Sequence, residues 1–323
     1  MKINTSKNTK FFWKDKKVLV TGGAGFLGKH LVKQLKKLKP DKIFIPRSKD
    51  FDLRFIKNCR KVVKNIDIVI HLAGNVGGIG YNMNNPGTLY YDNIMMGTNL
   101  MEEARQANVK KFVAVGTVCA YPKFAKVPFK EEELWEGYPE ETNAPYGLAK
   151  KMLLVQAQAY RQQYGFNGIY LIPVNLFGPF DNFDPKSSHV IPALIRKIHS
   201  AKINKLQVEV WGTGKATREF LFVEDAACGI LLATEKYDKP DPVNLGAGFE
   251  ISIKKLAKLI ADILAFKGEI KFDTTKPNGQ PRRLIDTSRA KKEFGFVAQT
   301  QFEKGLRQTI SWYLKNYDIN KKI

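Results

Sequence analysis

Apolar and polar positions follow two different rhythms along the first half of the chain. Short continuous apolar runs are typical of buried strands, whereas apolar residues spaced three and four apart are typical of amphipathic helices. The first run, KVLVTGG, ends in glycines and leads directly into the helical pattern FLGKHLVKQLKKL. Further runs that predict strands are residues 42–46, 67–74, 111–117 and 168–178. Helical patterns lie between them, including residues 99–108 and 149–165.

This order of elements predicts the fold class. Strands that alternate with helices form βαβ units, in which the strands are parallel and the crossovers right-handed. We therefore expect an α/β protein with a Rossmann-type doubly wound parallel sheet, formed mainly by residues 1–178.

After about residue 178, strand and helix patterns no longer alternate regularly. A loop-like stretch, GPFDNFDPKSSH, precedes a helical pattern at 190–202, and a second helical pattern covers 252–266. The strand-like PVNLGAG predicts that part of the chain near 219–247 returns to the main sheet. Residues 179–323 are otherwise expected to form mainly a smaller α/β lobe that binds substrate.

The chain is strongly basic, with 53 Lys and Arg against 31 Asp and Glu and a formal net charge of +22. Nucleic acid, an acidic membrane or a small anion are all partners compatible with such an excess. Tracts such as KHLVKQLKKLK fit the solvent faces of amphipathic helices, and no recognised nucleic-acid motif accompanies them. We therefore expect no nucleic-acid partner.

Targeting and cysteine patterns narrow the class further. No run of eighteen apolar residues is present, and the basic N-terminus lacks the apolar core of a secretory signal. These features predict a cytoplasmic protein without a membrane partner. Cys59, Cys119 and Cys228 are isolated, so neither a disulfide framework nor a metal site is expected.

The first candidate site is the turn GGAGFLG between the first strand and helix. Gly22, Gly25 and Gly28 stand in GxxGxxG spacing, which lets the backbone turn tightly and approach a pyrophosphate at the helix N-terminus. Strand, turn and helix in this order predict dinucleotide binding. The expected cofactor contacts include Phe26 and Leu27 in the turn and Ala73 after a later strand.

The end of the second strand predicts which dinucleotide binds. An NAD site usually carries an acidic residue there, whereas the 2′-phosphate of NADP requires cations. This chain has Arg47, Ser48 and Lys49 at that point. We therefore predict NADP(H), with Arg47 at the phosphate and with Asp52 and Leu53 at the adenine.

A second candidate site lies in the segment TNAPYGLAK. Tyr146 and Lys150 are four residues apart on an expected helix and share one face. A nearby ammonium stabilises a phenolate, which makes the phenol usable as an acid or base. Together with the glycine turn and a hydroxyl at Thr117, this pair resembles the extended short-chain dehydrogenase/reductase superfamily.

The resemblance narrows to one family. The segments GNVGGIGYNMNNP, GTVCAYP, NLFGPFDNFDPKSSHVIPAL, WGTGKATREFLFVED and KPNGQPRRLID, with TNAPYGLAK, are similar to the GDP-L-fucose synthase family. They run in family order from about residue 17 to 316. The resemblance implies an NADPH-dependent epimerase and reductase of a nucleotide-linked 4-keto-6-deoxy sugar, GDP-linked by preference, and a homodimer.

The resemblance also implies a role for each site residue. Thr117, Tyr146 and Lys150 fall on the catalytic triad, and Cys119 and His189 on the two proton-transfer residues. A 4-keto group acidifies carbons 3 and 5, so a base on one face and an acid on the other can invert them. The residues implied for the substrate cleft are Asn175, Lys197, Trp211, Arg218 and Arg282.

Departures from the family pattern keep alternatives open. The triad hydroxyl is threonine rather than serine, Val118 replaces a second serine, and Lys197 replaces an arginine. One alternative is a 4-epimerase or 4,6-dehydratase, although the dehydratases carry an Asp-Glu pair where this chain has Val118 and Cys119. Another is an epimerase that uses NAD(P) without net reduction. A third is a non-enzymatic nucleotide-sensing or nucleic-acid-binding protein.

Overall fold

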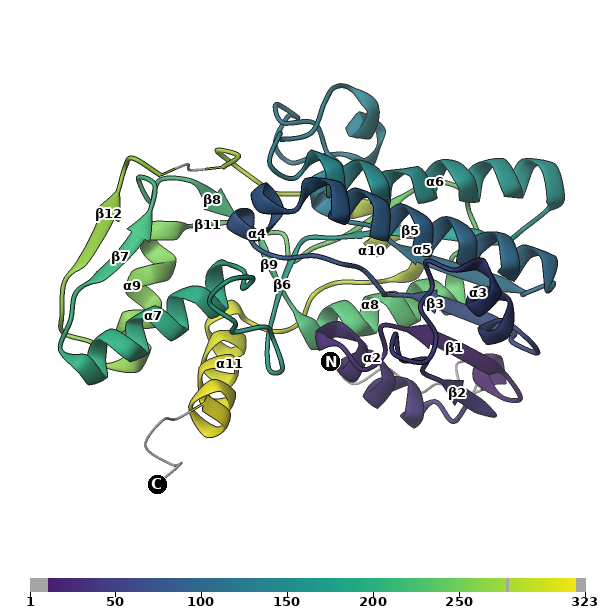
Figure 1. Ribbon diagram of the computed structural model, residues 1–323, viewed down its shortest axis with the longest axis horizontal. Coiled ribbons are helices and arrows are strands. Elements are labelled where there is room, and N and C mark those ends of the chain that lie inside the picture. Colours follow the sequence, from purple (N-terminus) through teal and green to yellow (C-terminus); the bar gives the residue numbers. More distant parts are fainter. Residues whose placement is uncertain (1–10, 277–278, 318–323) are drawn as a thin grey trace.

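The computed structural model describes residues 11–276 and 279–317. Its centre is a six-stranded parallel sheet in the order β10-β5-β4-β3-β1-β2 (Figure 1). This sheet confirms the expected Rossmann-type α/β fold. Its strands are β1 (Lys17–Thr21), β2 (Lys42–Phe44), β3 (Ile68–His71), β4 (Lys111–Val115), β5 (Gly168–Pro173) and β10 (Val243–Leu245).

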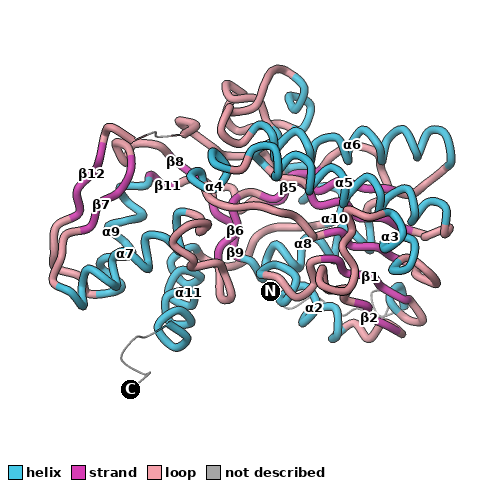
Figure 2. Tube along the Cα trace, viewed as in Figure 1, coloured by secondary structure: helices cyan, strands magenta, loops and turns pink. Residues whose placement is uncertain are grey.

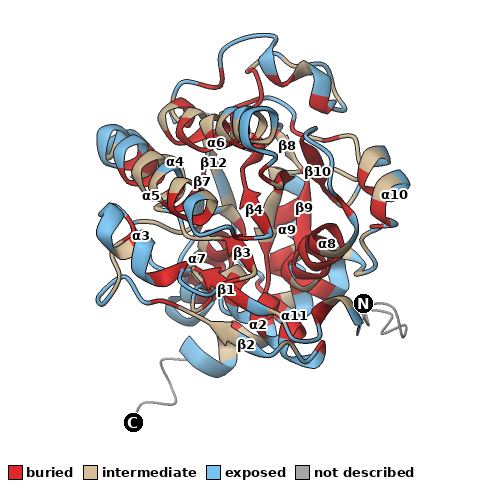
Figure 3. Ribbon diagram, turned by 90° about the vertical axis from the view of Figure 1, so that its right-hand side faces the viewer, coloured by how far each residue is buried: buried red, intermediate tan, exposed pale blue. Residues whose placement is uncertain are grey.

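Helices cover both faces of this sheet, as Figure 3 shows in a view turned by 90°. On one face, α5 (Pro86–Gln106) packs between α3 (Ile56–Val62) and α6 (Ala144–Tyr164). On the other, α8 (Val223–Lys236) packs between α2 (Phe26–Lys37) and α10 (Ser288–Phe294). Because both faces are covered, β3, β4 and β5 are buried along their whole lengths.

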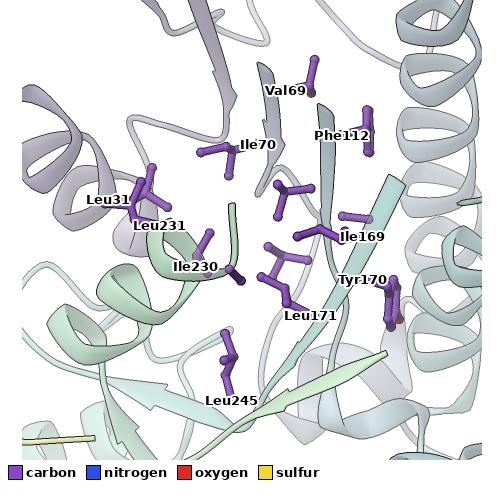
Figure 4. Packing of buried hydrophobic residues seen from close by; sticks show 14 of the residues in the cluster. Leu31, Val69, Ile70, Phe112, Ile169, Tyr170, Leu171, Ile230, Leu231 and Leu245 are labelled. Atoms are coloured by element: carbon purple, nitrogen blue, oxygen red, sulfur yellow. The ribbon is translucent and has the colours of Figure 1, made fainter. Parts of the chain in front are cut away.

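The main hydrophobic core lies between the sheet and these helices. In Figure 4, Leu31 of α2 and Leu231 of α8 lie on one side of the sheet, and Phe112 and Tyr170 lie on the other. All four side chains are at most 1% exposed.

A second hydrophobic core defines a smaller lobe. It is built by α7 (Val190–Asn204), α9 (Ile253–Leu264) and α11 (Phe302–Tyr317). Beside them, β7 (Val208–Trp211) and β12 (Ile270–Asp273) form a parallel pair at the outer edge of this lobe (Figure 2). Two more pairs lie between the lobes: β6 (Asn175–Phe177) with β9 (Phe220–Phe222), and β8 (Thr217–Arg218) with β11 (Ile251–Ser252).

Two features differ from the elements expected from the sequence. The run at 168–178 is two strands, because the chain leaves the main sheet after Pro173 and β6 pairs with β9. Residues 285–296 return to the main core, where Ile285, Phe294 and Phe296 are buried. The return near 219–247 is present in α8 and β10. The remaining short helices are α4 (Ile79–Asn84), η1 (Val118–Ala120) and η2 (Glu131–Trp135).

Candidate active site

A large cavity runs along the carboxyl ends of β1, β3 and β4 and continues between the two lobes. Its walls include the glycine turn, the ends of these strands, the start of α6 and residues 185–197 of the smaller lobe. In open α/β sheets, ligands bind at this edge of the strands. The position of the cavity therefore agrees with a nucleotide-binding cleft.

The glycine turn is packed so tightly that side chains are excluded. Gly22 has φ +68°, and a Cβ there would lie 2.8 Å from the amide nitrogen of Ala73. At Gly28 a Cβ would meet backbone atoms of Gly22 and Gly23 at well under 3.0 Å. No side chain caps the N-terminus of α2 at Gly25, and its first turn holds no acidic residue. The turn therefore presents backbone amides to an anion, which fits a dinucleotide pyrophosphate.

The basic cluster after β2 lines the same cavity. Arg47, Ser48 and Lys49 are exposed, so their polar atoms face the cavity and solvent. Asp52 also lines it, but its carboxylate is paired with Arg54 at 2.6 Å. The Arg54 guanidinium lowers the pKa of Asp52 and holds it as an anion. Leu53 is 5% exposed and provides an apolar wall beside it.

The candidate catalytic hydroxyls come from η1 and α6. Thr117 is the N-cap of η1 and its hydroxyl accepts a hydrogen bond from the Cys119 amide at 3.2 Å. Tyr146, one turn before Lys150 on α6, lies close enough to Thr117 for the threonine side chain to lower the pKa of the phenol. Gly147 lets α6 approach this closely, because a Cβ there would meet the Cys119 carbonyl.

Burial sets the charges of this pair. It raises the pKa of Tyr146, and the nearby Cys119 raises it further, so the phenol is protonated at neutral pH. Burial lowers the pKa of Lys150 to about 8, so most of the ammonium remains charged at pH 7. The site thus places a proton donor beside a cation.

Arg283 and Arg218 act on Cys119 in the cavity wall, and Arg283 also acts on His189. Arg283 donates from Nη1 to Sγ of Cys119 at 3.6 Å. His189 is the N-cap of α7 and is exposed in the open cavity; its enclosure between the lobes, followed by the charge of Arg283, lowers its pKa. Burial and Arg283 also lower the pKa of Arg218, to about 9. His189 is therefore mainly neutral at pH 7, and both arginines are charged.

The position of His189 depends on a contact between the lobes. The Gly78 amide donates to the Ser187 carbonyl at 3.0 Å. A Cβ on Gly78 would lie well under 3.0 Å from the Ser188 carbonyl oxygen. The loop before α4 therefore rests directly against the backbone that leads into His189.

The cavity brings together nearly all of the residues expected from the sequence. All five candidate catalytic residues line it, as do Gly22, Gly25, Phe26, Leu27, Gly28, Arg47, Asp52, Leu53 and Ala73. Four of the five candidate substrate residues also line it: Asn175, Lys197, Trp211 and Arg218. Three of these donate hydrogen bonds within the protein: Lys197 to the Glu209 carbonyl and Asn175 to the Glu219 carbonyl, each at 3.0 Å, and Arg218 to the Thr217 carbonyl at 2.7 Å.

Arg282 is the exception. Its guanidinium forms an ion pair with Glu250 and is 55% exposed, and the next residue, Arg283, lines the cavity instead. Residues 281–283 run beside 217–219, with the Thr217 amide donating to Pro281 and the Glu219 amide to Arg283. Side chains alternate along such an extended segment, so Arg282 and Arg283 face opposite ways. Ile285, an apolar residue two positions after Arg283, is buried. Because alternate residues share a face, its presence in the sequence indicates that Arg283, and not Arg282, lies on the buried face.

Within residues 11–276 and 279–317, no group of three or more His, Cys, Asp or Glu side chains is arranged to hold a metal ion. No helix in the same ranges is long and apolar enough to span a membrane.

Comparisons with known proteins agree with this geometry. Residues 18–246 match the model of the NAD dependent epimerase/dehydratase family. The chain is 37% identical over 310 residues to "Probable GDP-L-fucose synthase 1" of Oryza sativa, with 95% of this chain and 94% of the relative covered.

Solved structures are similar over nearly the whole chain. A GDP-6-OMe-4-keto-L-xylo-heptose reductase from C. jejuni has a TM-score of 0.88 at 29% identity, covering 93% of this chain and 98% of that one. A GDP-L-fucose synthetase from Naegleria fowleri bound to NADP has a TM-score of 0.85 at 32% identity, covering 95% and 96%.

Proposed function

The chain belongs to the GDP-L-fucose synthase branch of the NAD-dependent epimerase/dehydratase family, and we propose that Thr117, Cys119, Tyr146, Lys150 and His189 carry its reaction. It is an epimerase and reductase that uses a nicotinamide cofactor. Its substrate is a nucleotide-linked 4-keto-6-deoxy sugar: GDP-4-keto-6-deoxy-mannose, converted to GDP-L-fucose, or a close analogue. The observation that supports the residue assignment most directly is the convergence of all five side chains on one cavity.

Epimerisation requires proton transfer on both faces of the sugar. The 4-keto group lets a proton leave carbon 3 or 5, because the electron pair moves onto the carbonyl oxygen as an enolate. In the proposed reaction, Cys119 and His189 stand on opposite faces: one takes the proton and the other returns one to the same carbon. Thr117 and Tyr146 donate hydrogen bonds to the oxygen while it carries charge.

Reduction then uses the same hydroxyls. The nicotinamide, when bound, supplies the hydride that reaches carbon 4. Tyr146 gives its proton to the carbonyl oxygen, and the Lys150 ammonium stabilises the phenolate that remains. The neutral state that burial imposes on Tyr146 supports its role as the donor.

NADP(H) is the cofactor that we propose. The uncapped first turn of α2, directly after the glycine turn, would offer its backbone amides to the pyrophosphate, and Arg47, Ser48 and Lys49 would hold the 2′-phosphate. The carboxylate of Asp52 is held by Arg54, which leaves Leu53 and the backbone for the adenine. The diphosphate of the sugar nucleotide would be held by Lys197, Arg218 and Arg283 beside Trp211 and Asn175.

The test combines product analysis with isotope exchange. The protein is incubated with NADPH and GDP-, dTDP-, CDP- and UDP-linked 4-keto-6-deoxy sugars, and the products are identified by NMR. We expect stoichiometric NADPH consumption with a GDP-linked sugar; epimerised product without NADPH consumption would indicate an epimerase. In deuterium oxide, Cys119→Ser and His189→Ala should slow exchange at carbons 3 and 5 by about 100-fold or more. Unchanged exchange in both variants would contradict their assignment.

We also propose a homodimer and a cytoplasmic location. Helices α5 and α6 lie side by side at the surface, where Tyr90, Tyr91 and Val155 are 44%, 55% and 44% exposed. Apolar side chains at such positions suit a face shared by two copies.

The three cysteines are free thiols, which suits the reducing cytoplasm. Light scattering should give twice the chain mass, Val155→Glu should halve it, and cell fractionation would test the location.

A further inference from the structure

Arg283 is a buried cation that contacts the candidate proton-transfer thiol. Its side chain is only 6% exposed, and Nη1 donates to Sγ of Cys119 at 3.6 Å. On the other side, Nε donates to Oε1 of Gln280 at 3.1 Å. Gln280 is 4% exposed and is itself fixed, because Nε2 donates to the Lys123 carbonyl at 2.9 Å. The guanidinium is therefore held at the sulfur by a rigid neutral amide.

No carboxylate within residues 11–276 and 279–317 forms an ion pair with Arg283. A buried charge without a counter-ion is costly, and an anion at hydrogen-bonding distance lowers that cost. The acidic group at that distance is the thiol of Cys119, whose ionisation would supply the missing negative charge.

The other charged and titratable groups around Cys119 do not oppose this ionisation. Tyr146 lies near the sulfur from α6 and is protonated, and His189 at the start of α7 is mainly neutral. Arg218 on β8 adds a second positive charge that acts on Cys119. Glu140 acts on Arg218, but its carboxylate accepts hydrogen bonds from Thr142 and Asn143.

We propose that Arg283 is a positioning residue that fixes the Cys119 sulfur at the substrate face and stabilises the thiolate formed when the thiol gives up its proton. In the proposed reaction, neutral His189 takes a proton from one face of the sugar carbon, and the Cys119 thiol gives its proton to the other face and becomes a thiolate. Proton transfer from His189 to the thiolate through solvent then restores both groups. Its catalytic use rests on the function proposed above. The ionisation itself is a property of the free protein, so it is measured without sugar or NADPH.

The test is the pH dependence of Cys119 alkylation by iodoacetamide, followed by mass spectrometry. The thiolate displaces iodide, so the rate reports the ionised fraction. Cys59 and Cys228 compete poorly, because burial raises their pKa values to about 12 and about 11. In Arg283→Gln, the midpoint pH should rise by about one unit or more, which slows alkylation about tenfold below the midpoint. Arg283→Lys should restore part of the shift.

Arg282→Gln is the matched control, because it removes the same charge one residue away from a side chain paired with Glu250. It should leave the midpoint unchanged. An unchanged midpoint in folded Arg283→Gln, or an equal shift in Arg282→Gln, would overturn the proposal. A raised substrate KM with unaltered alkylation would do so as well, since it would assign Arg283 to the substrate alone.

A second measurement covers the case in which Arg283→Gln fails to fold. The ultraviolet absorbance of the thiolate is followed against pH as the difference between the native protein and Cys119→Ser. A midpoint pH that is higher with Arg283→Lys than with the native arginine supports the proposal, and an equal midpoint overturns it. Loss of the proposed function would leave both readouts intact, because neither contains a sugar nucleotide.

Discussion

At the residue scale, burial fixes the starting charges of the site before any ligand arrives. Tyr146 is held neutral and Lys150, with a pKa of about 8, is still mostly charged at pH 7. The pKa of His189 is lowered by its enclosure between the lobes and by the charge of Arg283, so its cationic form is disfavoured. Each of these states follows from neighbours that are distant along the chain. The residue types alone therefore leave the charges of the resting site undetermined.

Arg47 carries the first prediction at this scale. Arg47→Ala should reduce the preference for NADPH over NADH, measured as the ratio of the two kcat/KM values, by about tenfold or more. The physical reason is the loss of a charge-assisted hydrogen bond to the 2′-phosphate. Lys42→Ala, an exposed change at the opposite end of β2, is the control and should leave the ratio as it was. An unaltered ratio in Arg47→Ala would remove this residue from the phosphate site.

The residues that the sequence indicates best are those in local motifs. The glycine turn, Tyr146 and Lys150 lie within short segments whose spacing already fixes their geometry. Arg283 lies in no such motif, and choosing it over Arg282 requires knowing which face of an extended segment is buried. Its contact with Cys119 spans 164 residues of sequence, so only the tertiary fold reveals it.

At the element scale, the loop before α4 sets the position of α7 across the cavity. Gly78→Ala should displace the backbone at Ser188 and move His189, because the added Cβ has no room. We expect deuterium exchange at carbons 3 and 5 to fall by about 10- to 100-fold, since a shift of about 1 Å has this effect on reacting groups.

Gly87→Ala is the control for this change, because a Cβ at that position of α5 meets nothing within 4 Å. The affinity of Gly78→Ala for NADPH, measured by fluorescence titration, should stay within about twofold, since the glycine turn is untouched. Normal isotope exchange in a folded Gly78→Ala protein would show that the loop does not position His189.

Element types could be predicted from periodicity, but two boundaries could not. The apolar run at 168–178 continues through Val174 without a break in hydrophobicity, so the sequence predicts one strand. In the structure it forms two strands, β5 in the main sheet and β6 paired with β9. The helix from Pro86 is longer than the pattern at 99–108, because its first turns carry mixed residues and Pro occupies N1. In both cases the boundary of the element depends on contacts with distant parts of the chain, which the local pattern of apolar residues does not contain.

At the scale of the whole molecule, Glu219 joins separate segments beneath the cavity. Its carboxylate accepts hydrogen bonds from the amides of Ala247, Gly248 and Ile285 at 2.6, 2.8 and 2.9 Å. The side chain is fully buried, and burial raises its pKa from 4.5 to about 7 despite these bonds. The segments after β10 and before α10 are thereby tied to the strand that separates the lobes.

The sign of the pH effect follows from linkage. A raised pKa in the folded state means that this group contributes stability below about pH 4.5 and loses it as pH rises through about 7. In urea unfolding, the stability advantage of the native protein over Glu219→Gln should therefore shrink between pH 5.5 and 8. Glu269→Gln, at a 65% exposed side chain, should run parallel to the native protein. If the stability advantage of the native protein over Glu219→Gln grew with pH instead, it would contradict the raised pKa of Glu219.

The division of the chain into two lobes can be predicted only in part from the sequence. The return to the main sheet near 219–247 has a strand signal in PVNLGAG, whereas the second return at 285–296 rests on a seven-residue helix with little periodicity. Consequently the smaller lobe is assembled from several separate stretches of chain. Its core draws on α7, α9 and α11, whereas α8, β10 and α10, which lie between them in the sequence, pack in the main lobe.

The place of β10 at the edge of the main sheet has a consequence for biosynthesis. β10 covers the backbone of β5, yet it is translated roughly 70 residues later. At about 5–20 residues per second, the ribosome needs several seconds to supply it. During that interval the nascent β5, apolar along its length, presents an open edge to other chains. A chaperone that covers this edge until β10 is made would therefore protect the nascent chain from pairing with other chains.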